Sequence, residues 1–202
     1  MFICDDDQEY KSNLIQNMLN NINKLGVYQN RYNIVKHGSG GIIHGYVGNL
    51  IHSSLLENLK AIAEIVILEK ELIKNKIDQL IAKFELDAIR DTKAKYLSGG
   101  KKKKLVIALA LLSDPEILLL DECFAALDVL TIKMLQEIIV NLQTENNITI
   151  CICDHQARDL LSCVDIALIL SNCKIVAHGS PSDLVNNIEA KNAYFGNAFK
   201  FN

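Results

Sequence analysis

Tryptophan is absent from this chain of 202 residues, and proline occurs only twice. These absences argue against a loop-rich scaffold and favour an α/β protein. A strong excess of one charge is also missing, since the formal net charge is −3, and nothing in it predicts a nucleic-acid partner. Half of the residues are apolar and 22% are charged, which excludes a disordered composition. The length fits one domain, or one domain with a small subdomain.

Long apolar runs are missing as well. No stretch reaches the roughly 18 apolar residues of a membrane helix, and the best candidate, 61–68, is interrupted by Glu64. The first seven residues include Asp5–Asp7 and lack the pattern of a secretory signal. The six cysteines lie in apolar contexts without paired spacing. We interpret them as reduced thiols of a cytosolic protein.

The chain also lacks a glycine-rich motif that binds phosphate. The chain contains no copy of GxxxxGK[ST], the loop that holds nucleotide phosphates. Only Gly100 is followed by lysine, and Lys102 stands where this motif needs serine or threonine. The glycine-rich stretch 38–41 has no lysine after it and is predicted to be a turn or linker.

The first half of the chain is predicted to be mostly helical. Residues 11–25 have one apolar face, and Gly26 follows as a stop signal. Ser54 and Glu57 form a capping-box pattern that opens a helical stretch ending near residue 86. This stretch is either a set of packed helices or a helical subdomain that offers a groove to a partner. Its last turns have an apolar face made of Ile77, Leu80, Ile81 and Phe84.

From residue 97 onward, helices alternate with buried strands. The strands read as apolar runs rather than as alternating patterns, which is typical of a parallel sheet. A hairpin and a helix opened by Ser180-Pro181 complete the chain. Helices are predicted over 99–112, 130–143 and 156–162, buried strands over 116–120 and 148–153, and the hairpin strands over 166–170 and 174–177.

Two adjacent carboxylates, Asp121 and Glu122, end the first of these strands. Strand ends of this kind form the edge at which α/β sheets bind ligands. In nucleotide hydrolysis, one carboxylate holds Mg²⁺ and the next polarises the attacking water. The pair alone is weak evidence, because a strand end with two solvated acids has the same sequence.

The tetrapeptide Leu97-Ser98-Gly99-Gly100 strengthens this interpretation. Ser98 is suited to cap a helix, and the two glycines leave backbone N–H groups uncovered at the start of that helix. Such an end binds anions, although a capped helix with two flexible residues would look the same. Asp121 follows Ser98 by 23 residues, and the combination is far more specific than either motif alone.

Two further elements follow in order. The segment 125–128 ends in Asp128, and His155 follows the next strand. An imidazole at this position is suited to contact a γ-phosphate, although a single histidine at a strand end is often purely structural.

Together these motifs resemble the ATP-binding subunit of an ABC transporter, over about residues 55–202. Leu97–Gly100 resembles the signature motif, 117–122 the Walker B strand, 125–128 the D-loop, and His155 the switch histidine. The C-terminal segments 154–158, 177–181 and 193–199 resemble the lipopolysaccharide-export ATPases, and branched-chain amino-acid importers share part of this tail.

The resemblance implies ATP and Mg²⁺ as cofactors. It implies that Asp121 holds the metal and that Glu122 and His155 are catalytic. It assigns nucleotide binding to Leu97, Ser98, Gly99, Gly100, Asp128 and Asn49. Two ATP-binding subunits would enclose two ATP molecules, each between one subunit's Walker A loop and the other's signature motif. The dimer would drive membrane permease subunits from the cytoplasmic face of the inner membrane.

The chain also departs from the family pattern. The Walker A loop is absent, Asn49 stands where a glutamine is expected, and Cys123 replaces a proline. Lys101 replaces a glutamine or glutamate, and Leu109 an arginine. The lysines 102–104 match a basic run of the family, and we interpret them as a solvated face. The resemblance therefore predicts an N-terminally truncated subunit that alone binds ATP poorly and hydrolyses it negligibly.

The expected fold class is α/β. It comprises an incomplete P-loop NTPase-like sheet core, a helical subdomain and a C-terminal hairpin-helix extension. The expected units are an N-terminal remnant (1–50), a helical subdomain with the signature motif (51–113), and the half of the core that carries Walker B, D-loop and switch histidine (114–202). Two alternatives stay open: an inactive remnant, and the C-terminal half of a chromosome-maintenance or DNA-repair ATPase. The sustained heptads of a coiled coil, which are expected of the chromosome-maintenance or DNA-repair ATPase, are absent from the sequence.

Overall fold

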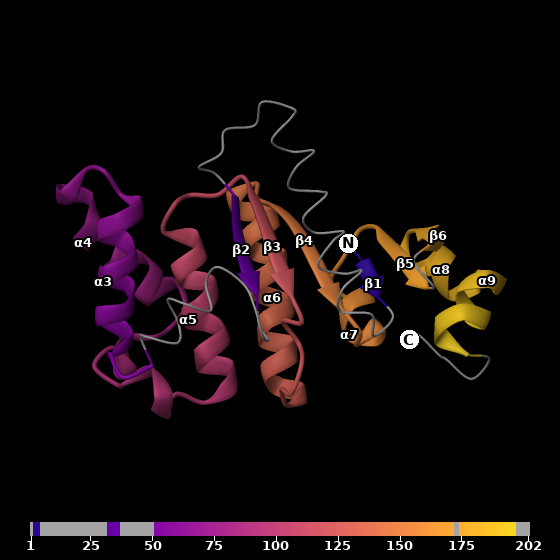
Figure 1. Ribbon diagram of the computed structural model, residues 1–202, viewed down its shortest axis with the longest axis horizontal. Helices are drawn as coiled ribbons and strands as arrows, with labels where there is room; N and C mark the ends of the chain where they lie inside the picture. Colours follow the sequence, from indigo (N-terminus) through magenta and orange to yellow (C-terminus); the bar gives the residue numbers. More distant parts are fainter. Residues whose placement is uncertain (1, 5–31, 37–50, 172–173, 197–202) are drawn as a thin grey trace.

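A computed structural model describes residues 2–4, 32–36, 51–171 and 174–196 of the chain. Its centre is a six-stranded sheet with the strand order β2-β3-β4-β1-β5-β6 (Figure 1). Neighbouring strands are parallel except β5 and β6, which form the predicted antiparallel hairpin. The strands are β1 (Phe2–Cys4), β2 (Tyr32–Lys36), β3 (Ile117–Asp121), β4 (Thr149–Asp154), β5 (Ala167–Ser171) and β6 (Lys174–Gly179).

The apolar run of β3 explains its place inside the sheet. Leu118, Leu119 and Leu120 are consecutive and all buried, so both faces of the strand are covered. In the β3–β4 register, Ile117 lies opposite Thr149 and Asp121 opposite Cys153. The carboxyl ends of both strands therefore meet at one edge of the sheet, as predicted for a parallel pair.

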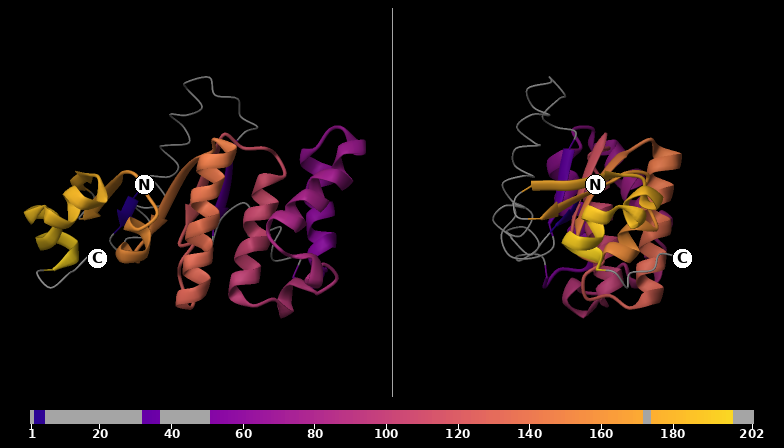
Figure 2. Two further views of the ribbon diagram at one scale, coloured as in Figure 1. Left: turned by 180° about the vertical axis from the view of Figure 1, so that it is seen from behind. Right: turned by 90° about the vertical axis from the view of Figure 1, so that its right-hand side faces the viewer.

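Helices cover one face of this sheet and extend beyond its ends (Figure 2). The long helix α6 begins after the capping residue Asp128 and is capped at its C-terminal end by Asn147, which adopts a left-handed conformation (φ 54°). Helix α5 packs beside β2 and α6. The bounds are α5 (Gly99–Leu111), α6 (Val129–Asn146) and α7 (Ala157–Leu161).

At the β2 end of the sheet, α3 (Leu55–Val66) and α4 (Lys70–Lys83) form a helical lobe against α5. The capping box predicted at its start is present, with Ser54 and Glu57 each accepting the other's backbone N–H. The predicted apolar face, Ile77, Leu80, Ile81 and Phe84, is buried. Two short 3-10 turns, Asp87–Ile89 and Ala94–Tyr96, lead from this lobe to α5.

At the other end, the hairpin carries the C-terminal elements. Ser180 caps α8 (Pro181–Asn186) in a second capping box, with Asp183 as its partner. The short helix α9 (Ile188–Ala190) continues into a π-helical turn, η3 (Lys191–Phe195). None of the helices in the described part of the chain is long and apolar enough to cross a membrane.

The predicted α/β class is therefore confirmed, while the N-terminal part of the sheet was not foreseen. Strands β1 and β2 come from the first 36 residues, and β1 lies between β4 and β5. Such long-range pairing leaves no periodic signal within a three-residue strand. The helix predicted over 11–25, the glycine-rich stretch 38–41 and Asn49 lie outside the described residues.

Candidate functional site

The predicted metal ligand Asp121 and the predicted catalytic residue Glu122 lie where β3 leaves the sheet. Asp121 is the last residue of the strand, and its Oδ1 atom is buried. Glu122 follows with a φ of 48°, in the left-handed region that non-glycine residues seldom adopt. Its backbone N–H donates to the carbonyl of Cys153 over 2.7 Å, which ties the turn to the end of β4.

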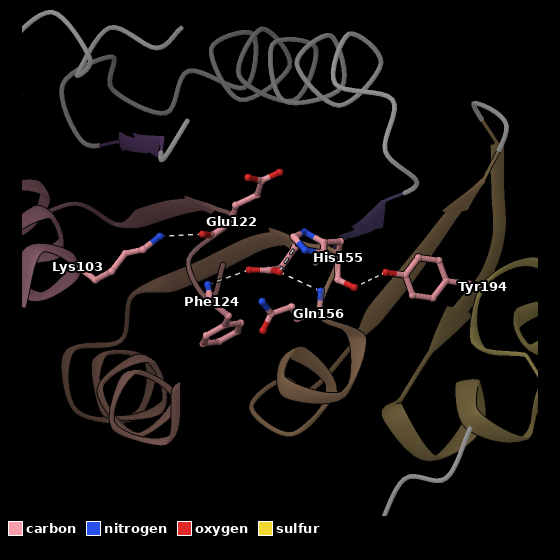
Figure 3. Close-up of polar contacts among 7 residues, drawn as sticks. Lys103, Glu122, Phe124, His155, Gln156 and Tyr194 are labelled. Carbon is pink, nitrogen blue, oxygen red and sulfur yellow. Dashed lines mark hydrogen bonds and ion pairs between the residues drawn. The ribbon is translucent and has the colours of Figure 1, made fainter. Parts of the chain in front are cut away.

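A buried lysine fixes the other side of this turn. Lys103 of α5 is 4% exposed, and its Nζ donates to the backbone carbonyl of Glu122 over 2.8 Å (Figure 3). Burial lowers the pKa of Lys103, and nearby acidic groups partly oppose that shift. The interpretation of 102–104 as a solvated face is therefore wrong at Lys103, whereas Lys102 is exposed. The side chain turns inward because its helical position faces the end of β3.

The buried carboxylate of Asp154 fixes the backbone next to the predicted switch histidine, His155. The side chain of Asp154 is fully buried and accepts the N–H of Phe124 over 2.9 Å and that of Gln156 over 3.0 Å. His155 lies above it at the same sheet edge as Glu122, with half of its side chain exposed. Its Nδ1 is 3.8 Å from Oδ1 of Asp154. The backbone of His155 is thus fixed while its imidazole remains accessible.

The signature segment begins α5 in an unusual way. Ser98 has the extended conformation of a capping residue, but its hydroxyl makes no capping bond to α5, unlike those of Ser54 and Ser180 in their helices. The predicted capping position is correct and the expected hydrogen bond is not formed within this described helix. The first-turn N–H groups are consequently left for another acceptor.

Close packing explains both signature glycines. A Cβ atom on Gly100 would lie 2.6 Å from Cγ2 of Thr131, and one on Gly99 would lie 3.1 Å from Cδ2 of Leu127. Asp128 caps α6 by accepting the N–H of Thr131 over 3.0 Å and its hydroxyl over 2.6 Å. These bonds lower the pKa of Asp128. The signature segment and the D-loop segment therefore form one packed unit.

The structure thus arranges the predicted residues in two groups. Asp121, Glu122 and His155 meet at the carboxyl edge of the sheet, whereas the segment 97–100 and Asp128 lie at the junction of α5 and α6. Lys103 links the two groups. Sequence reasoning missed Lys103 and Asp154, and the signal for Asp154 was a charged residue ending a buried strand.

The acidic pair suits Mg²⁺ only in the company of a ligand. Within the described residues, no three His, Cys, Asp or Glu side chains cluster closely enough to hold a metal ion. Mg²⁺ commonly uses one or two carboxylates and takes its other ligands from water and phosphates. Asp121 would supply such a carboxylate, with Glu122 beside it for the attacking water.

The position of β1 reveals a signal that sequence reasoning overlooked. β1 is parallel to β4, with Ile3 opposite Asp154, so the chain leaves Cys4 at the same edge as His155. The residues Lys11-Ser12 then stand at the spacing of the last two positions of GxxxxGK[ST]. Asp5 and Tyr10 occupy the two glycine positions. Residues 5–12 lie outside the described part of the structure.

Comparison with known proteins identifies the family of this chain. The sequence pattern of the family described as ABC transporter matches residues 11–125, beginning at Lys11 and well before the expected start at residue 55. The lipopolysaccharide export system ATP-binding protein LptB of Haemophilus influenzae is 35% identical over 73% of this chain and 61% of its own length. LptB of Escherichia coli is 31% identical over 73% and 61%. The chain thus spans less than two thirds of the curated relatives it matches.

Solved structures show the same fold. The structure of cbiO1 from Clostridium perfringens, part of the ABC transporter complex cbiONQ, has a TM-score of 0.75 at 21% identity. That likeness covers 95% of this chain and 81% of cbiO1. MJ1267 in its ADP conformation, an ATP-binding cassette of an ABC transporter, has a TM-score of 0.68 at 21% identity over 86% and 70%. The chain therefore belongs to the ABC transporter family and has the fold of its ATP-binding domain.

Proposed function

We propose that this chain is an ATP-binding subunit of lipopolysaccharide-export type, coupled to permease subunits at the cytoplasmic face of the inner membrane. The 35% identity to LptB of Haemophilus influenzae supports the subtype. The match to the ABC transporter pattern favours a transport subunit over a DNA-repair ATPase.

The observation that carries the proposal is the edge formed by β3 and β4. Asp121 would hold Mg²⁺, Glu122 would polarise the attacking water, and His155 would contact the γ-phosphate. The turn after β3 is fixed by the Cys153 carbonyl and by Lys103, so the backbone that carries the Glu122 side chain is held in place. Such fixed placement is what positioning catalysis requires.

The other group of residues would serve a second subunit. Leu97–Gly100 and Asp128 would act on the nucleotide held by that subunit, and Asn49 would take the place of the loop glutamine. The Ser98 hydroxyl and the first-turn N–H groups of α5 suit a phosphate acceptor, because Ser98 does not cap its own helix.

This chain would bind its own nucleotide weakly. A phosphate loop needs glycines because several consecutive N–H groups must turn toward the anion. Asp5 and Tyr10 at the glycine positions work against that conformation, and Asp5–Asp7 repel phosphate. Lys11 and Ser12 remain as the part of the motif that would contact phosphate and Mg²⁺.

Calorimetric titration with Mg-ATP tests whether the chain itself binds ATP weakly. The chain alone should show no micromolar binding. The variant Asp5→Gly/Tyr10→Gly should bind measurably tighter, and adding Lys11→Ala should abolish the gain. Micromolar, Mg²⁺-dependent binding by the unaltered chain would refute the proposed weakness.

An inactive remnant is the second candidate, favoured by the lost glycines and by Cys123 in place of proline. Cys123 is buried, and burial raises the pKa of its thiol well above the ordinary value. Purification of the tagged chain from its native membranes separates the candidates. Permease subunits should accompany a working subunit, and their absence would favour the remnant.

A further inference from the structure

Tyr194, in the C-terminal turn η3, contacts the switch region from outside the sheet. Its hydroxyl donates to the backbone carbonyl of His155 over 2.5 Å, across 39 positions of sequence (Figure 3). The same carbonyl accepts the N–H of Ala157 over 3.0 Å. The C-terminal elements and the switch residue are therefore joined by a direct polar contact.

The geometry of η3 directs the tyrosine ring toward this carbonyl. Phe195 packs edge-on against it, with ring centroids 5.7 Å apart and planes at 87°. Gly196 ends the turn with a φ of 70°, and its N–H donates to the carbonyl of Lys191 over 2.7 Å. Both rings border a surface pocket shared with His155 and Arg158. The ring is thus held on one side by packing, and its hydroxyl reaches the switch loop.

Contacts on both sides fix the backbone of His155. The buried Asp154 carboxylate accepts the N–H of Gln156, the residue after His155. The hydroxyl of Tyr194 donates to the backbone carbonyl of His155 itself. The imidazole itself is half exposed. Its position therefore depends in part on the main chain that these two contacts hold.

We propose that Tyr194 is a positioning residue for His155, which orients the switch imidazole by holding its backbone carbonyl. The role rests on the proposed function of His155 at a γ-phosphate. The contact makes η3 a part of the nucleotide site, although it lies 39 residues further along the chain.

Tyr194→Phe removes the hydroxyl and keeps the ring. Amide exchange at Gln156 and Ala157 should accelerate on the order of fivefold, as expected from the loss of one hydrogen bond. The ¹³C-labelled imidazole signal of His155, assigned with His155→Gln, should shift or broaden. Tyr96→Phe is the matched control, because Tyr96 is 70% exposed and belongs to a different element, the 3-10 turn Ala94–Tyr96. It should change neither signal.

Phe195→Leu tests for general loosening of η3. It weakens the ring packing and leaves the Tyr194 hydroxyl in place, so it should change exchange and the imidazole signal less than Tyr194→Phe. Equal effects of Phe195→Leu and Tyr194→Phe, or unchanged signals in Tyr194→Phe, would overturn the proposal. These measurements need no nucleotide, so they give a result even if the proposed ATP function fails.

Reconstituted assemblies extend the test to turnover. In assemblies whose chain carries Asp5→Gly/Tyr10→Gly, so that it is expected to bind its own nucleotide, Tyr194→Phe should lower kcat with little change in KM, and it should add nothing when combined with His155→Ala. An additive loss in that double variant would contradict action through His155, whereas absence of turnover in every assembly would count against the proposed function alone.

Discussion

Two buried charges, those of Lys103 and Asp154, support the candidate site without reaching its accessible side. Each binds backbone: Lys103 the carbonyl of Glu122, and Asp154 the N–H groups of Phe124 and Gln156. The sequence identified the exposed chemistry at Glu122 and His155 but not these supports. A run of four lysines gives no indication of which one faces the sheet, because that depends on how α5 lies against β3.

Replacement of Asp154 by alanine should be costly. It would leave two backbone donors without their buried acceptor, and lost hydrogen bonds to a charged group cost about 1.5–3 kcal/mol each before relaxation. We expect the free energy of unfolding of Asp154→Ala to fall by about 2–4 kcal/mol in urea denaturation. Asp91→Ala, at an exposed position, should change it by less than about 0.5 kcal/mol. Similar values for the two variants would contradict the role of Asp154.

At the scale of elements, the sequence patterns predicted β3, β4, α5 and α7 within one residue at each end, whereas α6 ends three residues beyond its predicted bound. They failed for β1 and β2, whose pairing partners lie more than 80 residues away in sequence. The signature motif can be recognised in the sequence, but its close packing against α6 cannot be predicted from it. That fit depends on Thr131, which belongs to another helix and carries no motif of its own.

The close packing at the start of α5 predicts a larger loss of stability for substitution of Gly100 than for substitution of Gly99. Gly100→Ala places a methyl group 2.6 Å from Cγ2 of Thr131 and should lower the free energy of unfolding by about 1–3 kcal/mol. Gly99→Ala meets only the flexible end of Leu127 and gains helix propensity, so it should cost less than about 1 kcal/mol.

Thr131→Ser provides the rescue. It removes Cγ2 and keeps the hydroxyl that bonds Asp128, so Gly100→Ala should cost at least 1 kcal/mol less in the Thr131→Ser background, on the order of the overpacking strain. Thermal and urea unfolding of the four proteins of this cycle give the coupling. Additive effects would show that the helix contact does not explain Gly100.

At the scale of the whole molecule, the sheet order joins the two ends of the chain, because β1 lies between β4 and the hairpin strand β5. The sequence predicted the α/β sheet core and the edge that carries the carboxylates, since these follow from local patterns. The closure of the sheet by the first residues depends on contacts that no local pattern records.

Buried thiols should make this fold sensitive to alkali. Burial raises the pKa of Cys163 from its ordinary value of 9.0 to about 12. Above pH 9 the unfolded thiol loses its proton while the folded thiol keeps it, so the unfolded state is favoured as pH rises toward 12. The stability of the unaltered chain relative to Cys163→Ala should fall by up to about 1.4 kcal/mol per pH unit between pH 9 and 10.5. Parallel stability curves would contradict the assignment.

We propose that this chain binds its own nucleotide weakly and keeps the half-site that would complete a partner's nucleotide site. The direct test is a co-purified mixed dimer with LptB of Haemophilus influenzae, whose own signature serine has been replaced by arginine so that it cannot complete a site by itself. ATP turnover by this dimer should appear with the unaltered chain and disappear with Ser98→Arg. A dimer that hydrolyses no ATP, or one whose turnover is unchanged by Ser98→Arg, would show that this chain does not complete the partner's nucleotide site.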